Sequence, residues 1–238
     1  MRKVLLIIIG LLIQQLAIAQ NLIFKDADFK NAVLNYEPRI DLNQDGEIQS
    51  NEADSVTILN LMKKNIHSME DAYLFPNLIE LALTTNEIAE VKLIGLMQLK
   101  RFSCAANKVT YAEVKNMPQL ERLWMNFNQI DTIILDSLPK LKSLALEGNK
   151  LTNINLSPFP LLENIGLSDN QLKKIDITQN LELIQLMIAD NPLIELDIRS
   201  NTKLKTHILY VDSSVKLITT SSQQKAIEQR GLGVTFSE

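Results

Sequence analysis

This chain of 238 residues has little of several residue types on which other protein classes depend. A single cysteine excludes an intramolecular disulfide framework. Glycine and proline number seven each, too few for a collagen-like or linker-dominated chain. Aromatic residues make up 5%, so aliphatic side chains must supply nearly all of the core. The formal net charge of −4 predicts no basic surface, and we expect no nucleic-acid partner.

Aliphatic residues are what the chain has in excess. Hydrophobic residues make up 46% of the sequence and its mean hydropathy is +0.02, which excludes wholesale disorder. Leucine and isoleucine alone account for about a quarter of the chain, and asparagine is also abundant. A bias toward so few residue types predicts a repeated structural unit.

Residues 1–19 have the pattern of a secretory signal peptide. Arg2 and Lys3 form a basic start, an apolar run follows over 4–12, and Ala-Ile-Ala at 17–19 is a small-residue cleavage pattern. A membrane anchor would need about 18 uninterrupted apolar residues, and two glutamines interrupt the run too early. We expect no transmembrane anchor and a mature chain that starts near Gln20 and is secreted, periplasmic or held at the cell surface.

A period of 21 residues organises most of the remaining sequence. The pattern Leu-x-x-Leu-x-Leu-x-x-Asn-x-Leu recurs eight times, with starts 22 residues apart once and 21 apart six times. The repeats start at Val56, Leu78, Leu99, Leu120, Leu141, Leu162, Leu183 and Leu204. The ninth place holds Lys64, Asn86, Asn107, Asn128, Asn149, Asn170, Asn191 and Asp212. Only the two ends deviate from asparagine, which is typical of capping repeats.

This pattern resembles the leucine-rich repeat family, in its 21-residue bacterial form with a second half such as Ile175-Asp176-Ile177. The resemblance spans Val56 to about Asp212. It implies an α/β solenoid: a curved coil with a parallel sheet on its concave face. Exported bacterial proteins of this family usually serve in interactions, so the resemblance also implies a binding role.

The spacing has a physical reading of its own. Side chains on a strand alternate between its faces, so places four and six of each repeat point inward. Asparagine at place nine can pair the backbone groups that the turn leaves inside the coil. An amphipathic helix would partly mimic this leucine spacing. Four prolines within the repeats argue against it, because they would break long helices: Pro139, Pro158, Pro160 and Pro192.

Residues 41–52 match the twelve-residue EF-hand calcium loop. Gly46 permits the sharp turn and Ile48 belongs in the apolar core. The expected Ca²⁺ ligands are the side chains of Asp41, Asn43, Asp45, Gln49 and Glu52 and the backbone carbonyl of Glu47. A turn without metal is the alternative, but such a turn has no use for Glu52.

The surroundings of the loop favour a structural metal over a sensor. A short helix is expected over 26–35, capped by Asp26, and Pro38 ends it before the loop. No second loop is present to pair with the first. We therefore expect an EF-hand-like cap that closes the N-terminal end of the sheet.

These observations divide the chain into four parts. Residues 1–19 are the signal peptide, 20–55 the EF-hand-like cap, 56–212 the eight leucine-rich coils and 213–238 a C-terminal cap. Within the last part we expect a helix over 221–230, a turn at 231–233 and a strand over 234–236.

Catalytic groups are scarce. His67 and His207 lie seven coils apart, and Cys104 occupies place six of its repeat, which predicts a buried thiol. Asp169 and Asp190 stand at equivalent places of adjacent coils and predict a solvated acidic face. They would also be the only acids for a hydrolase. We therefore expect no enzyme.

The outward places of the sheet carry the candidate ligand site. Trp124, the only tryptophan, is expected to point to solvent from the middle of the array. Tryptophan with arginine is the composition of binding hot spots, and an aromatic flanked by donors also suits a sugar. The candidate ligand-binding residues are Arg101, Arg122, Trp124, Asn126 and Phe127. A surface aromatic without a ligand is the alternative.

Two functions follow from this pattern. The first is an exported, non-enzymatic module that binds a protein or glycan. The second is a structural or adhesive surface protein without a discrete ligand site. The pattern specifies neither the ligand nor an oligomeric state.

Overall fold

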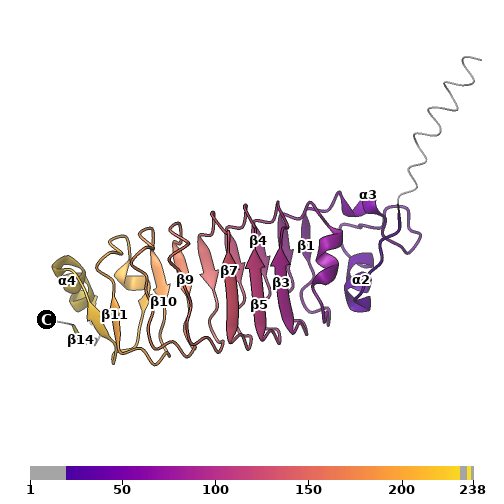
Figure 1. The fold of residues 1–238 in the computed structure, drawn as a ribbon. Helices are drawn as coiled ribbons and strands as arrows, with labels where there is room; N and C mark the ends of the chain where they lie inside the picture. The colour runs from indigo at the N-terminus through magenta and orange to yellow at the C-terminus, as the bar shows by residue number, and fades with distance from the viewer. Residues whose placement is uncertain (1–19, 231–234, 237–238) are drawn as a thin grey trace, which may run out of the picture.

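The protein is a parallel β-solenoid, seen in a computed structural model that describes residues 20–230 and 235–236 (Figure 1). The expected signal peptide and the expected turn at 231–233 lie outside the described residues. Successive coils run along the long axis of the molecule, and a short helical module precedes them at the N-terminal end (Figure 1).

Eight short strands, one from each coil, form a continuous parallel sheet, here called the main sheet. Its strands, in spatial order, are β1 (Ile58–Asn60), β2 (Glu80–Ala82), β4 (Arg101–Ser103), β6 (Arg122–Trp124), β8 (Ser143–Ala145), β9 (Asn164–Gly166), β10 (Gln185–Met187) and β12 (Leu209–Tyr210). This confirms the parallel-sheet solenoid of eight coils. The helical reading of the leucine pattern is wrong.

The alternation along each strand places the core. Leu81 and Leu83 are fully buried while Ala82 between them is half-buried on the outer face. A fully buried aliphatic side chain contributes roughly 1.5 to 3 kcal/mol. Each coil supplies several such side chains and relies on its neighbours to cover them, because no coil has a closed core of its own.

The asparagines at place nine form a hydrogen-bonded ladder inside the coils. The Asn149 Nδ2 group donates to the carbonyls of Leu146 (2.9 Å) and Met125 (3.1 Å), and its Oδ1 accepts the Ile130 N–H (3.0 Å). The same pattern recurs at Asn128 and Asn170. The predicted role of these asparagines is confirmed.

A second wall returns the chain behind the main sheet. Two three-stranded parallel sheets form parts of it. One consists of β3 (Glu90–Ile94), β5 (Tyr111–Lys115) and β7 (Thr132–Asp136), and the other of β11 (Glu195–Asp197), β13 (Lys216–Ile218) and β14 (Thr235–Phe236).

A second amide ladder, which the repeat pattern did not predict, runs through the C-terminal coils. Asn180 and Asn201 are fully buried and donate to carbonyls of the preceding coil. Gln223, on helix α4 (Ser221–Arg230), continues the ladder by donating to Ile198 O (2.7 Å). The helix expected over 221–230 is confirmed, and its glutamine closes the last coil.

The expected register of the eighth coil is wrong. β12 pairs Leu209 with Leu186, so Leu209 takes place four where the 21-residue period put His207. The 3₁₀ turn η2 (Thr206–Ile208) lies just before the strand and lengthens the coil by two residues. Asp212 therefore does not join the asparagine ladder, and its carboxylate accepts the Asp190 N–H (2.8 Å).

The N-terminal module contains α2 (Ala27–Leu34) and α3 (Ser50–Ala53) and packs on the first coil, whose return segment holds the 3₁₀ helix η1 (Glu70–Leu74). Asp26 caps α2 as predicted, because its Oδ1 accepts the N–H groups of Asp28 and Phe29. The rings of Phe24, Phe29 and Phe75 form an aromatic cluster with centroids 6.2 to 6.3 Å apart.

Two tyrosines, Tyr36 of this module and Tyr73 of η1, satisfy backbone groups at strand edges. The Asn60 N–H on β1 donates to the Tyr36 hydroxyl (3.0 Å). The Tyr73 hydroxyl donates to Lys92 O (2.6 Å) and accepts the Ile94 N–H (2.9 Å) on β3. Unpaired edges invite pairing with other chains, so both contacts protect the N-terminal end of the solenoid.

Candidate functional site

The loop at 41–52 is shaped by bonds from its own backbone. Asp41 accepts the N–H groups of Gln44 (2.7 Å) and Gly46 (3.1 Å), and these bonds curl the loop. Glu52 is 3% exposed, and its carboxylate accepts the Leu42 N–H (2.8 Å) and the Gln49 N–H (2.9 Å). Glu52 therefore closes the loop and starts α3 at the same time.

Four of the six expected ligand residues, Asn43, Asp45, Gln49 and Glu52, line one hollow of about 440 Å³, whereas Asp41 and Glu47 do not line it. The Asn43 Nδ2 group donates to Asp45 Oδ2 (2.9 Å) and to Gln49 Oε1 (3.2 Å), and the Gln49 Nε2 group donates to Asp45 Oδ2 (3.0 Å). Within the described residues, no three acidic, histidine or cysteine side chains form a metal-binding group. Carboxylate and amide oxygens are ligands that suit a hard cation such as Ca²⁺, and to bind one here the Asn43 and Gln49 amides would have to turn their oxygens toward it.

The segment at residues 20–22 pairs with the loop on the side where a regular EF-hand pairs with a second loop. The Leu22 N–H donates to Ile48 O (2.8 Å) and the Ser50 N–H to Gln20 O (3.1 Å), forming an antiparallel bridge. Ile48 itself is fully buried, as predicted. The chain around residues 20–22 therefore supports the back of the loop.

The structure places Trp124 in the middle of the main sheet and half-buried on its outer face. Its indole N–H donates to the Ser143 hydroxyl (3.1 Å), so the ring leans toward the next coil. The exposed Arg122 guanidinium lies 5.8 Å from the ring centroid, within reach of a cation–π contact.

Phe127 stands beside Trp124 because the chain turns at place eight. The backbone there is left-handed in the inner coils, with φ of 56° at Phe127 and 64° at Gly148. The Phe127 ring is 66% exposed and covers Gly148, where a Cβ would lie 2.7 Å from the ring. Trp124, Asn126 and Phe127 line one shallow pocket of about 340 Å³.

Arg101 does not join this cluster. Its guanidinium pairs with Glu80 of the preceding coil (2.5 Å) and is not among the residues that line the pocket. Of the five expected residues, Trp124, Asn126 and Phe127 line the pocket. Arg122 does not line it but contacts the Trp124 ring, and Arg101 stands next to Arg122 in the sheet with its charge paired to Glu80.

Glu147 belongs to the same face and was not predicted. Its carboxylate accepts a hydrogen bond from the Asn126 amide and lies over Gly166. Burial raises the pKa of Glu147, and the Glu147 N–H and the Asn126 amide only partly oppose this shift. Glutamate at place seven gave no signal in the sequence, since its burial depends on the missing side chain at Gly166.

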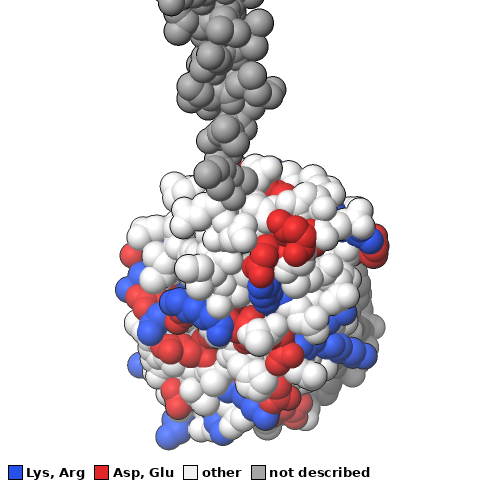
Figure 2. Space-filling model, turned by 90° about the vertical axis from the view of Figure 1, so that its right-hand side faces the viewer, with Lys and Arg blue, Asp and Glu red and all other residues white. Residues whose placement is uncertain are grey.

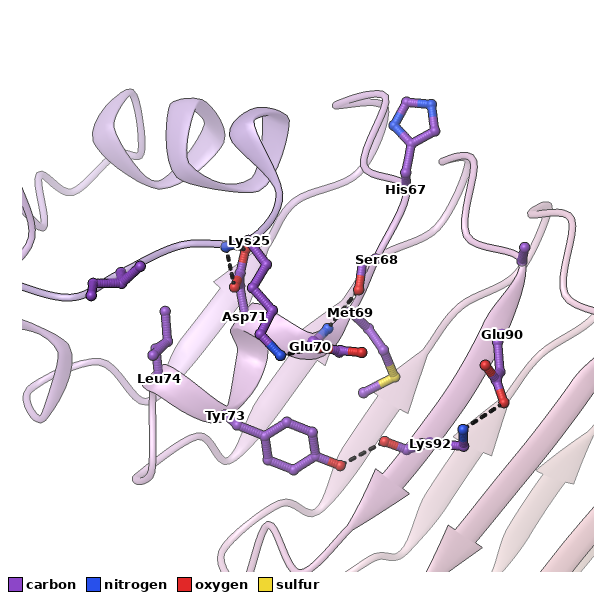
Figure 3. Close-up of a pocket in the computed structure, with 12 residues that line it drawn as sticks. Lys25, His67, Ser68, Met69, Glu70, Asp71, Tyr73, Leu74, Glu90 and Lys92 are labelled. Atoms are coloured by element: carbon purple, nitrogen blue, oxygen red, sulfur yellow. Dashed lines mark hydrogen bonds and ion pairs between the residues drawn. The ribbon is translucent and has the colours of Figure 1, made fainter.

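A cavity of about 600 Å³ lies between η1 and β3 (Figure 3). Four of its charged residues form ion pairs, Lys25 with Glu70 and Lys92 with Glu90, and the Asp71 carboxylate accepts the N–H groups of Lys25 and Asp26. The Tyr73 ring and Met69 point into the same space (Figure 3). The sequence pattern had no signal for this cavity, because it forms between the module and the second wall.

The cysteine and the histidines considered for catalysis do not come together, whereas Asp169 and Asp190 stand in adjacent coils. Burial raises the pKa of the Cys104 thiol to about 12, and the predicted buried position is confirmed. His67 lies beside η1, whereas His207 lies in η2 at the other end of the solenoid. Asp169 and Asp190 occupy left-handed turns with φ of 55° and 57°.

The N-terminal end of the molecule carries acidic and basic side chains next to one another (Figure 2). No helix within residues 20–230 is long and apolar enough to cross a membrane.

Comparison with known proteins shows the fold. No family model matches the chain, and no curated protein matches it in sequence. A leucine-rich repeat protein of Leptospira interrogans matches at 17% identity with a TM-score of 0.57, over 78% of this chain and 55% of that one. Internalin C2 of Listeria monocytogenes matches at 18% identity with a TM-score of 0.50, over 82% of this chain and 94% of that one.

A further match, InlJ of Listeria monocytogenes, has 20% identity and a TM-score of 0.38, over 73% of this chain and 51% of that one. The chain thus spans about half the length of InlJ and of the Leptospira protein. The chain has the parallel-sheet solenoid fold of leucine-rich repeat proteins.

Proposed function

We propose that this chain is an exported, non-enzymatic binding module whose partner docks on the outer face of the main sheet around Trp124. One observation carries the proposal: the only tryptophan lies half-buried at the centre of that face, with Arg122 over its ring and an exposed Phe127 beside it. Large aromatic and arginine side chains at the centre of a surface are typical of binding hot spots.

A protein partner fits this face better than a glycan. Sugar rings stack on open indole faces, but the Trp124 ring is engaged by the Arg122 guanidinium and its N–H by Ser143. The exposed Phe127 ring offers apolar contact area instead. The buried thiol and the two distant histidines support a role in binding rather than in catalysis.

Replacing Trp124 by alanine tests the proposal. We expect Trp124→Ala and Arg122→Ala each to weaken capture of the partner from extracellular fractions by at least about tenfold, since truncated hot spots cost about 2 kcal/mol or more. Ile194→Ala, which removes a 78% exposed side chain beside β11, is the control. Equal capture by all four proteins would leave the proposed face without a role.

We also propose that residues 41–52 bind a structural Ca²⁺. Asp41, Asn43, Asp45, Gln49 and Glu52 would supply side-chain oxygens and Glu47 its carbonyl. The hollow lined by Asn43, Asp45, Gln49 and Glu52 supports this assignment, and the Asn43 and Gln49 amides would turn their oxygens toward the ion. The ion would add rigidity to the module that covers the first coil.

The calcium proposal predicts a shift in thermal stability. With a dissociation constant of about 0.1 to 1 mM, 10 mM Ca²⁺ should stabilise the fold by about 1.4 to 2.7 kcal/mol. The melting temperature should then rise by about 3 to 10 °C over the value in chelator. In Asp45→Asn the rise should fall by at least half, whereas Asp54→Asn, just outside the loop, should keep it. A wild-type melting curve indifferent to Ca²⁺ would refute the site.

A further inference from the structure

Glu147 is a carboxylate held partly out of water on the outer face of the main sheet. A Cβ at Gly166 would lie 1.9 Å from Glu147 Oε1, so only glycine leaves room for the carboxylate at this place. The Asn126 amide donates to the other oxygen, Oε2. The Glu147 side chain is thereby held between Asn126 of the fourth coil and Gly166 of the sixth coil.

No lysine, arginine or histidine within the described residues pairs with Glu147. Among the residues that the structure describes, ten ion pairs occur, and none includes Glu147. On the same face Glu80 has its own partner in Arg101. Burial raises the pKa of Glu147, as expected for a carboxylate without a cation. Partly desolvated carboxylates are stabilised by an opposite charge that arrives with a partner.

The neighbours decide from which side a cation can approach. Arg122 occupies the Trp124 ring, and its positive charge disfavours a second cation there. On the other side, the exposed Phe127 ring follows directly after Asn126, which contacts Glu147. An aromatic face attracts a cation, so Phe127 and Glu147 favour the same ligand group.

We infer that Glu147, Asn126 and Phe127 form a receiving site for a lysine or arginine side chain of a protein partner. The inference rests on the proposed function, because it specifies the partner of the same face. It adds that the partner presents a positive charge beside the aromatic contact.

The probe for this site is N-acetyl-arginine amide, with N-acetyl-citrulline amide as its uncharged counterpart. Fluorescence of Trp124 reports binding directly, since the chain has no other tryptophan. We expect saturable binding of the arginine probe and at least tenfold weaker binding of the citrulline probe. Glu147→Gln should reduce arginine binding to the citrulline level. Glu195→Gln, which removes an exposed carboxylate of β11, should leave it unchanged.

The fold of the variant is checked by its melting temperature. Because the folded protein raises the pKa of Glu147, ionisation opposes folding above that pKa and has no effect below the unfolded value. Glu147→Gln should therefore be at least as stable as the wild type at pH 7, and lost binding would not reflect unfolding.

Three results would overturn the inference: equal binding of the two probes, unchanged binding by Glu147→Gln, or stronger binding of glucosamine than of arginine amide. The last would assign the site to an amino sugar. Loss of partner capture in Trp124→Ala together with any of these would retain the proposed function and reject only the cation site. Unchanged capture in Trp124→Ala would reject the proposed function itself.

Discussion

Asn149→Ala should lower the free energy of unfolding by about 2 to 5 kcal/mol, although the side chain touches no ligand and no other polar side chain. Asn149 is 8% exposed and makes the only side-chain bond to the buried Ile130 N–H. Removing it leaves that N–H without a partner, at about 1 to 3 kcal/mol, and removes one bond each from the carbonyls of Met125 and Leu146. The Met125 carbonyl still accepts from Asn128 and the Leu146 carbonyl from Asn170, which limits the loss of stability.

Urea denaturation followed by far-UV circular dichroism measures this change. Asn149→Asp retains an acceptor for Ile130 but sets a charge against two carbonyls, so it should destabilise at least as much at pH 7. Asn153→Ala removes an exposed amide whose only side-chain contact is Thr152, and it should change stability by less than about 0.5 kcal/mol. Similar midpoints for Asn149→Ala and Asn153→Ala would show that the ladder does not stabilise the coils.

Asp26→Asn should cost about 2 to 4 kcal/mol at pH 7. The Asp26 carboxylate accepts the N–H groups of Asp28 and Phe29 on one oxygen and those of His67 (2.7 Å) and Ser68 (2.8 Å) on the other. It therefore caps α2 and ties the helix to the first coil with one side chain. An asparagine in its place would turn an NH₂ group toward one pair of donors.

The pH dependence of this effect follows from the pKa of Asp26. Burial alone would raise that pKa, but the N–H groups of Phe29, Ser68, His67 and Asp28 together hold it below its ordinary value of 3.8. The stabilisation is then present above about pH 4 and is lost as the pH falls through the lower folded pKa. The difference between wild type and Asp26→Asn should accordingly shrink below pH 4. Asp28→Asn, in the first turn of α2, should show a much smaller effect, and an equal one would argue against the tie.

The coil and its ladder could be predicted from the sequence because each depends on spacing alone. Leucine at places four and six and asparagine at place nine recur often enough to fix the strand, its face and its turn, as at Leu144, Leu146 and Asn149. The helix that Asp26 caps and the buried Cys104 were equally predictable. In both cases the residue type and its place in the local pattern were enough, because Asp before a helix acts as its N-cap and place six of a repeat points into the core.

What could not be predicted depends on contacts between different coils. The eighth coil departs from the period because η2 adds two residues before β12, and no motif marks that insertion. Asn180 and Asn201 stand at place nineteen, where the other repeats have apolar residues, and no motif predicts a role for them. Their role depends on the stacking of the coils, because Asn180 donates to Phe159 O and Asn201 donates to Asn180 O. Glu147 resembles any solvated glutamate unless Gly166 of the next coil is known to lie beneath it.

The two ends of the solenoid and the middle of its main sheet differ in what their side chains contact. At the N-terminal end, Tyr36 and Tyr73 occupy strand edges, and Lys25 pairs with Glu70. At the C-terminal end Gln223 continues the second amide ladder by donating to Ile198 O. The two ends thus serve to close the fold. In the middle of the main sheet Arg122 and Phe127 are exposed, and no ion pair of the described residues includes Arg122. This contrast supports the middle as the binding face.

The most direct test of the binding face is hydroxyl-radical footprinting of the protein with and without its captured partner. Oxidation of Trp124 and Phe127 should fall strongly in the complex, because the partner covers both rings. Tyr111, on β5 of the second wall, should be oxidised to the same extent in both states. Unchanged oxidation of Trp124 and Phe127, with protection elsewhere, would contradict the account.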